Sequence, residues 1–153
     1  MGCDIHMYLE YSFWNFSEGK FDTSLALNVG RDYTLFGLLA GVRGDSYNEI
    51  SPPRGVPEDI VHNTAMEYTL DAEDHKDYPW FKEWTGNVKG RGRHPDWHTA
   101  SWLTPEELDE VCRRYSNGMS GGGITNDIAF LRDVVRSAKK NYKSARVVFW
   151  FDN

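Results

Sequence analysis

Strict alternation of apolar and polar residues near the start of the chain is the feature that most limits its fold. From Cys3 to Tyr11 the odd positions are apolar or aromatic, whereas the even positions hold Asp4, His6, Tyr8 and Glu10. A period of two is that of a β-strand, whose successive side chains point to opposite faces. The pattern predicts a strand with one face on a core and one face that carries two carboxylates, an imidazole and a phenol.

The other periodic segments are of both helical and extended type. Apolar spacing and capping residues predict helices over 33–43, 58–68, 105–115 and 126–142, and strands after residue 21 and over 98–103 and 145–152. The last strand is apolar throughout, which is typical of a central strand buried on both faces. Residues 70–97 are polar, aromatic and rich in glycine, and they predict a long loop of the kind that is more often functional than idle.

Helical segments interleaved with strands indicate an α+β fold. We expect a single globular domain over residues 1–153, with a small mixed or antiparallel sheet packed by about three to four helices. The chain is 40% apolar and 14% aromatic, which is enough to form a core and excludes a wholly disordered protein. Without a run of eighteen apolar residues, it is not expected to cross or bind a membrane.

Charge and cysteine content restrict the partners and the compartment. The net charge is −6, with 23 acidic and 17 basic residues, so we expect no general attraction to duplex nucleic acid. Cys3 and Cys112 lack the CxxC spacing and are too few for a disulfide framework. With no cationic and apolar leader, the sequence predicts free thiols and a cytoplasmic location in a bacterial host.

Two Asp-x-His pairs suggest a metal site. Asp4 and His6 lie on the polar face of the first strand, and a second pair is formed by Asp96 and His98. Carboxylate and imidazole groups both bind first-row divalent metals. If the two segments meet, Asp4, His6 and His98 would hold Mn or Zn, and Glu10 or Asp96 would activate a water molecule. The alternative is an ordinary solvated sheet face with cross-strand hydrogen bonds.

Three arginines lie within one short stretch of the chain. Arg31, Arg43 and Arg54 are at helix boundaries or in a proline-rich connection, where bidentate capture of a phosphate is possible. Together with Trp97, whose ring can stack on any base, they predict binding of a small anionic ligand, most plausibly a nucleotide. The alternative for each arginine is an ion pair with a carboxylate or a contact with helix-end carbonyl groups.

A separate basic stretch, 89–93, has the sequence KGRGR. With Trp84 and Trp97 nearby, it resembles a nucleic-acid loop. Five residues in an acidic chain bind a duplex poorly, so contact with a single strand or a mononucleotide is the option left open.

Several segments together resemble a family of small uncharacterised proteins from phages and bacteria. They are the opening Met-Gly-Cys-Asp-Ile-His, Arg31-Asp32-Tyr33 with Leu35-Phe36, Leu39 to Arg43, Pro53 to Pro57, Asp96-Trp97-His98 with Ser101-Trp102-Leu103, and the ending Val148 to Asn153. The resemblance covers nearly the whole chain. It implies a phage or prophage setting and no particular activity.

These features lead to three functional hypotheses. The first is a metal-dependent hydrolase of a phosphoester, plausibly a nucleotide or cyclic nucleotide, in which the arginines neutralise phosphate. The second is a non-catalytic protein that sequesters a nucleotide signal in phage counter-defence. The third is a protein-binding inhibitor whose acidic surface mimics nucleic acid. The aromatic content also permits a homodimer interface.

Overall fold

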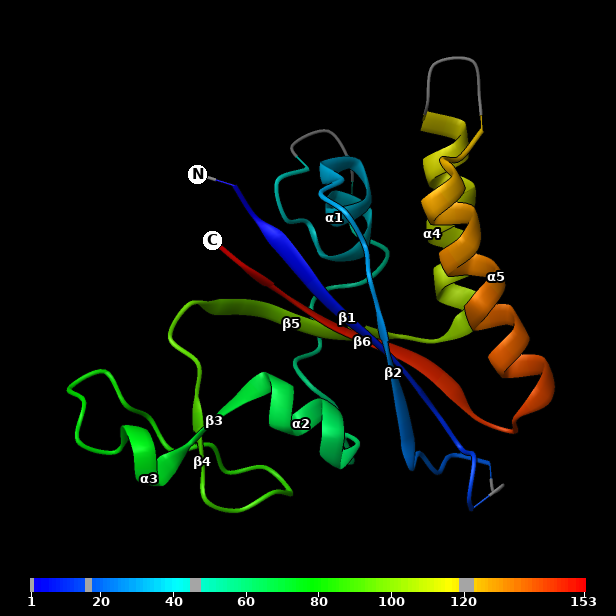
Figure 1. Ribbon diagram of the computed structural model, residues 1–153. Helices are drawn as coiled ribbons and strands as arrows, with labels where there is room; N and C mark the ends of the chain where they lie inside the picture. Colours follow the sequence, from blue (N-terminus) through cyan, green and yellow to red (C-terminus); the bar gives the residue numbers. More distant parts are fainter. Residues whose placement is uncertain (1, 16–17, 45–47, 119–122) are drawn as a thin grey trace.

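Four antiparallel strands form the central sheet of the computed structural model. The structure describes residues 2–15, 18–44, 48–118 and 123–153. The strand order is β2 (Thr23–Leu27), β1 (Asp4–Tyr11), β6 (Ala145–Asp152) and β5 (Trp97–Leu103), with every neighbouring pair antiparallel (Figure 1). Because β6 lies between β1 and β5, it is buried on both faces as its sequence predicted. The expected α+β class with a small antiparallel sheet is confirmed.

One face of the sheet, here called the core face, is covered by three helices. They are α1 (Tyr33–Ala40), α4 (Pro105–Gly118) and α5 (Asn126–Asn141). The odd-numbered residues of β1 and β6 point into this core, as strand alternation requires. The carboxylate of Asp32 caps α1 by accepting a hydrogen bond from the Leu35 N–H, and α4 and α5 lie side by side (Figure 1).

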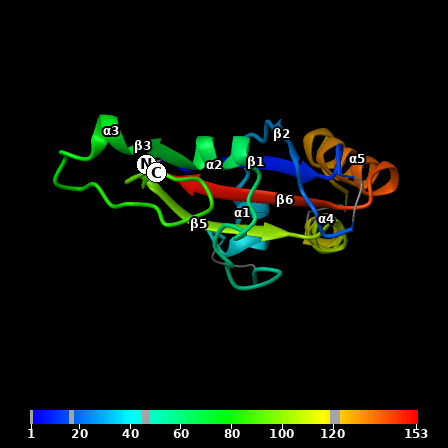
Figure 2. The ribbon, with the colours of Figure 1, turned by 90° about the horizontal axis from the view of Figure 1, so that it is seen from below.

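The opposite face, here called the aromatic face, is covered by a smaller core. It contains α2 (His62–Tyr68) and rings from β6 and β5, and its buried members are Ile60, Ala65, Trp84, Val148 and Trp150. Next to it, β3 (Thr69–Asp71) and β4 (Arg91–Arg93) form a two-stranded sheet, with α3 (Ala72–His75) directly after β3. Figures 1 and 2 agree that this small sheet and α3 lie at the end of the molecule opposite α4 and α5.

The predicted loop over 70–97 is wrong in part, because it contains α3, β4 and the end of β3. Residues 82–84 also run along β4: the Trp84 N–H donates to the Arg91 carbonyl oxygen at 2.9 Å, and the Arg93 N–H donates to that of Lys82 at 2.8 Å. Elements of three or four residues are too short to carry a hydrophobic period, which is why the sequence did not reveal them.

The second predicted helix begins later than expected. It starts at His62 instead of residue 58, and the backbone N–H of Val61 donates to the carboxylate of Glu10 at 2.8 Å. This contact between residues far apart in the sequence satisfies the N–H at the start of the helix. A sequence pattern identifies only capping residues that are close along the chain, so it could not identify this one.

Both cysteines are free and buried, as predicted. Burial raises the pKa of the Cys3 thiol, and it raises that of Cys112 to about 11. Both thiols are therefore protonated at neutral pH and poor nucleophiles.

No helix in the described part of the chain is long and apolar enough to span a membrane.

Candidate ligand-binding site

Glu10, predicted as a catalytic base, is part of a buried ion pair. Its side chain is completely inaccessible to solvent. One carboxylate oxygen accepts a hydrogen bond from Arg146 Nε at 2.8 Å, and the other accepts one from the backbone N–H of Val61. Arg146 continues the network to Asp59, also at 2.8 Å. Glu10 therefore ties together β1, β6 and the start of α2. A buried carboxylate with both oxygens engaged is not open to a water or a substrate, so the structure gives no support to the catalytic role predicted for Glu10.

Asp4 and His6 lie on one face of β1 as predicted, but each has a partner of its own. Asp4 accepts two hydrogen bonds from Arg31, at 2.6 and 2.9 Å, and these bonds lower the pKa of its carboxyl group. Nε2 of His6 lies 2.7 Å from a carboxylate oxygen of Asp152. The two side chains thus form separate pairs rather than one open set of ligands.

His98 lies on the other side of the sheet from His6. In the register, Asp152 of β6 is opposite both Asp4 and Trp97, whereas His98 is opposite Phe151. His98 therefore shares the core face with Phe151, and their rings stack with centroids 6.2 Å apart. Its Nδ1 is 2.8 Å from the hydroxyl of Thr99.

The predicted metal set of Asp4, His6 and His98 is thus not brought together. Throughout the described ranges, no three His, Cys, Asp or Glu side chains are arranged to hold a metal ion. Asp96, the other candidate base, is exposed in the turn before β5, where its N–H donates to Nδ1 of His94 at 3.3 Å.

The three predicted phosphate-binding arginines do not converge either. Arg31 is held by Asp4, and Arg54 forms a bidentate pair with Glu107 at 3.0 and 2.6 Å. Arg43 lies against the Cys3 thiol. Each guanidinium is engaged at a different place, so the alternative interpretation, ion pairing, is the one the structure supports for Arg31 and Arg54.

Trp97 is where the predicted site and the structure agree best, because its indole is the centre of a group of stacked rings on the aromatic face. The His94 ring lies parallel to it with centroids 4.1 Å apart and planes 5° apart. The rings of His6 and Trp150 each lie 5.2 Å away, and that of Tyr68 lies 6.1 Å away. These contacts make the group a rigid flat-walled surface.

A cavity of about 370 Å³ lies beside these rings. Its lining residues, which define the aromatic cleft, are Val56, Tyr68, Trp84, Arg93, His94, Trp97, His98 and Thr99. A second hollow of about 530 Å³ adjoins it and shares Val56, Trp84 and Arg93 with it. Cavities of this size accept small organic ligands, and flat aromatic walls suit a planar one.

The charge in the aromatic cleft comes from Arg93. Within the part of the chain that the structure describes, Arg93 is the only arginine whose guanidinium has no hydrogen-bond or ion-pair partner. Burial lowers the pKa of His94 below its ordinary value of 6.5, so that ring is neutral at pH 7. The cleft therefore combines aromatic walls with one cation that makes no ion pair in the described part of the chain; Glu58 shares the adjoining hollow with it.

A local irregularity of β5 borders the aromatic cleft. Pairing with β6 shifts between His98 and Ser101, and Thr99 has a φ of +54°. A positive φ is strained for a β-branched residue, and such strain is concentrated at functional sites. The bulge allows Trp97 and Trp102 to lie on the same aromatic face, although they are five positions apart and strict alternation would place them on opposite faces.

Sequence reasoning missed Tyr68 and the specific role of Arg93. The signal for the second was present, because residues 89–93 are basic and Trp84 and Trp97 flank them. The sequence alone does not show that Arg91 is buried against Thr69, with its Nε 2.9 Å from the hydroxyl, while Arg93 is exposed.

Comparisons with models of known protein families, with curated proteins and with solved structures each gave no match. The resemblance to phage and bacterial proteins stays a prediction, and the function must be inferred from the aromatic cleft itself.

Proposed function

We propose that the protein binds a nucleotide in the aromatic cleft without chemically changing it. The observation that carries this proposal is the unpaired guanidinium of Arg93 in a cavity walled by Trp84, Trp97 and His94. An arginine that makes no ion pair favours an anion, and a guanidinium fork matches two phosphate oxygens. Planar walls favour a base.

The two halves of a nucleotide fit the two parts of the cleft. The base stacks against the indole and imidazole rings, a contact that any base can make. The phosphate lies at Arg93, which lines both the aromatic cleft and the adjoining hollow. The phosphate can therefore remain close to solvent while the base is enclosed. In the phage setting that the sequence resemblance implies, such a protein would remove a nucleotide signal by sequestration.

Hydrolysis by a metal-dependent mechanism stays a prediction with weaker support. It needs several ligands around one ion, and Asp4, His6 and His98 are distributed over both faces of the sheet. The protein-binding inhibitor and the homodimer also stay predictions, because no described contact favours either of them.

The first prediction is that nucleotide binding does not depend on a metal. Isothermal titration of the protein with AMP, GMP, CMP and UMP should give one binding site in excess EDTA, with an affinity equal to that in added Mn²⁺ or Zn²⁺. Chromatography of the mixture after overnight incubation should return the nucleotide unchanged, because the described residues include no group of three metal-ligating side chains to activate a water molecule there.

Inorganic phosphate is the matched control ligand, since it offers the anion without the base. It should bind more weakly than any of the four nucleotides, because it forgoes stacking worth about 1–3 kcal/mol per base. Loss of binding in EDTA, or turnover restored by a metal, would instead support the hydrolase.

A further inference from the structure

A second group of stacked rings lies outside both cores. It consists of His75, Tyr78 and Trp80, here called the outer stack. The rings of Tyr78 and Trp80 are stacked with centroids 5.2 Å and planes 15° apart, and His75 lies about 6 Å from both (6.0 and 5.9 Å). Tyr78 is 53% exposed and Trp80 is 40% exposed. These exposed parts face solvent, although both are large aromatic residues.

The outer stack is held in place by backbone hydrogen bonds. The Tyr78 N–H donates to the His75 carbonyl oxygen at 3.1 Å, and the Phe81 N–H donates to that of Tyr78 at 3.0 Å. The Phe81 ring packs against Gly92 of β4, where a Cβ atom would lie only 2.1 Å from a ring carbon. The exposed rings therefore project from a fixed turn, so little conformational freedom is lost when a ligand stacks on them.

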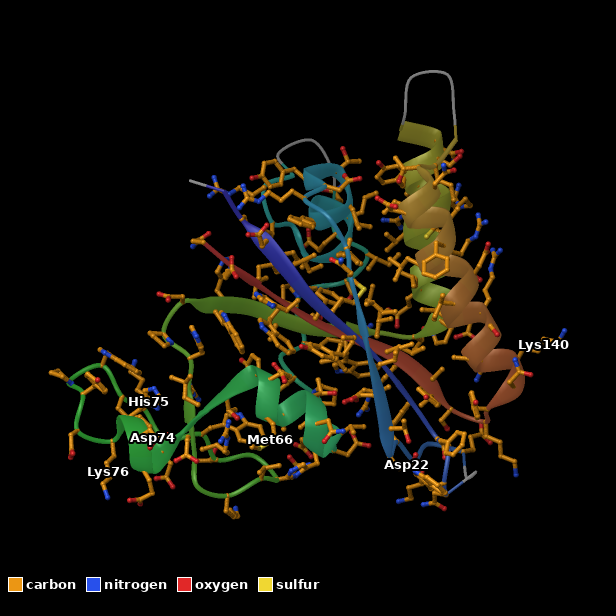
Figure 3. The ribbon with its side chains drawn as sticks, in the orientation of Figure 1. Asp22, Met66, Asp74, His75, Lys76 and Lys140 are labelled. Carbon is orange, nitrogen blue, oxygen red and sulfur yellow. The ribbon has the colours of Figure 1, made fainter. Side chains whose placement is uncertain are left out.

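The outer stack is connected to the aromatic cleft through the backbone pairing of Lys82 with Arg93. The Lys82 carbonyl oxygen accepts the Arg93 N–H at 2.8 Å, and Trp80 is only two residues from Lys82. Two extended residues span at most about 7 Å, so the backbone of Trp80 lies close to that of Arg93. His75 is also close enough to His94 for the two rings to interact electrostatically. Figure 3 shows His75 on α3, remote from Asp22 and Lys140 at the other end of the molecule.

The aromatic cleft with its unpaired Arg93 and the nearby outer stack together offer two ring surfaces and one cation. A mononucleotide uses only one ring surface and the cation. Successive nucleotides of a strand present base, phosphodiester and base, and sequence-tolerant stacking on aromatic side chains beside basic groups is how single strands are bound.

We propose that the aromatic cleft and the outer stack together bind a ligand with two bases joined by a phosphodiester, namely a dinucleotide or a short single strand. One base lies in the cleft, the phosphodiester lies at Arg93, and the second base stacks on Trp80. This inference rests on the proposed function, since it extends the same site.

The test compares one-base and two-base ligands on wild-type protein and on Trp80→Ala. Titrations with AMP, linear ApA, cyclic di-AMP and a six-residue oligoadenylate should show ApA binding more tightly than AMP in the wild type. Trp80→Ala should weaken ApA binding by about 5- to 150-fold, the expected loss of one stacked base, and leave AMP binding unchanged. Comparing the affinities of cyclic di-AMP and linear ApA shows whether the site prefers a cyclic or a linear dinucleotide.

Trp14→Ala is the matched control, because it removes an exposed indole from another part of the surface. Trp14 is 80% exposed, and its backbone N–H donates to Asp22, which lies at the end of the molecule remote from His75 (Figure 3). This variant should change neither the affinity for AMP nor the affinity for ApA. Tyr78→Ala provides a second variant should Trp80→Ala disturb the turn, and Trp80→Phe should recover part of the ApA affinity.

The outcomes separate the two proposals. AMP binding with ApA no tighter, or equal losses of both ligands in Trp80→Ala and Tyr78→Ala, would overturn the two-base inference and leave the proposed function in place. Absence of binding by every nucleotide would overturn both.

Discussion

Replacing Glu10 by alanine should lower the free energy of unfolding by about 3–5 kcal/mol, the cost of leaving one member of a buried ion pair without its partner. Glu10 is fully buried, and the variant would leave the Arg146 guanidinium and the Val61 N–H without the carboxylate that accepts their hydrogen bonds. Urea denaturation followed by tryptophan fluorescence measures this change. A catalytic base, as the sequence suggested, would instead lose activity while stability remained unchanged.

Two further variants serve as controls for Glu10→Ala. Asp4→Ala removes the carboxylate of an exposed ion pair from the same strand and should have a small effect, because such pairs contribute little. The double variant Glu10→Leu with Arg146→Met replaces both charges by apolar groups and should recover most of the lost stability. A Glu10→Ala protein as stable as the wild type would contradict the structural role.

Replacing Arg93 by alanine should weaken nucleotide binding by about 10- to 150-fold, corresponding to the loss of charge-assisted hydrogen bonds to phosphate. The fold should not change, because the guanidinium has no partner among the described residues. Titration calorimetry measures the affinity, and urea denaturation checks that the stability is that of the wild type.

Lys89→Ala is the matched control for Arg93. It removes the same charge from the same basic stretch, but Lys89 lines neither the aromatic cleft nor the adjoining hollow. Its effect should be less than about two-fold, as expected for a distant exposed charge at physiological salt. Equal losses in the two variants would mean that net charge attracts the ligand and that Arg93 has no specific role.

The regular part of the fold could be predicted because it is periodic. The alternation in β1 identified the correct faces, and helical spacing identified α1, α4 and α5. The segment from β3 to β4 could not be predicted, because it is held by pairings such as Lys82 with Arg93 and by rings packed on glycine. Those contacts leave no repeating pattern in the sequence.

Strand register and long-range pairing separate the residues that the sequence predicted to form one site. Asp4, His6 and His98 do lie near the same end of the sheet, but the register places His98 opposite Phe151 and so on the other face from His6. Likewise, Glu10 pairs with a residue 136 positions away, and no local pattern reveals such a partner. Trp97 could be singled out from the sequence because an aromatic residue near a basic stretch is a local signal, and its predicted role in binding stays a prediction.

The most direct test of nucleotide binding in the aromatic cleft is to locate the ligand by NMR. In ¹H–¹⁵N spectra of the protein titrated with AMP in EDTA, the indole N–H signals of Trp84 and Trp97 should shift and saturate together. The signal of Trp14, at the other end of the molecule, should stay fixed. Saturable shifts that leave Trp84 and Trp97 unchanged, or no shifts at millimolar AMP, would contradict the account.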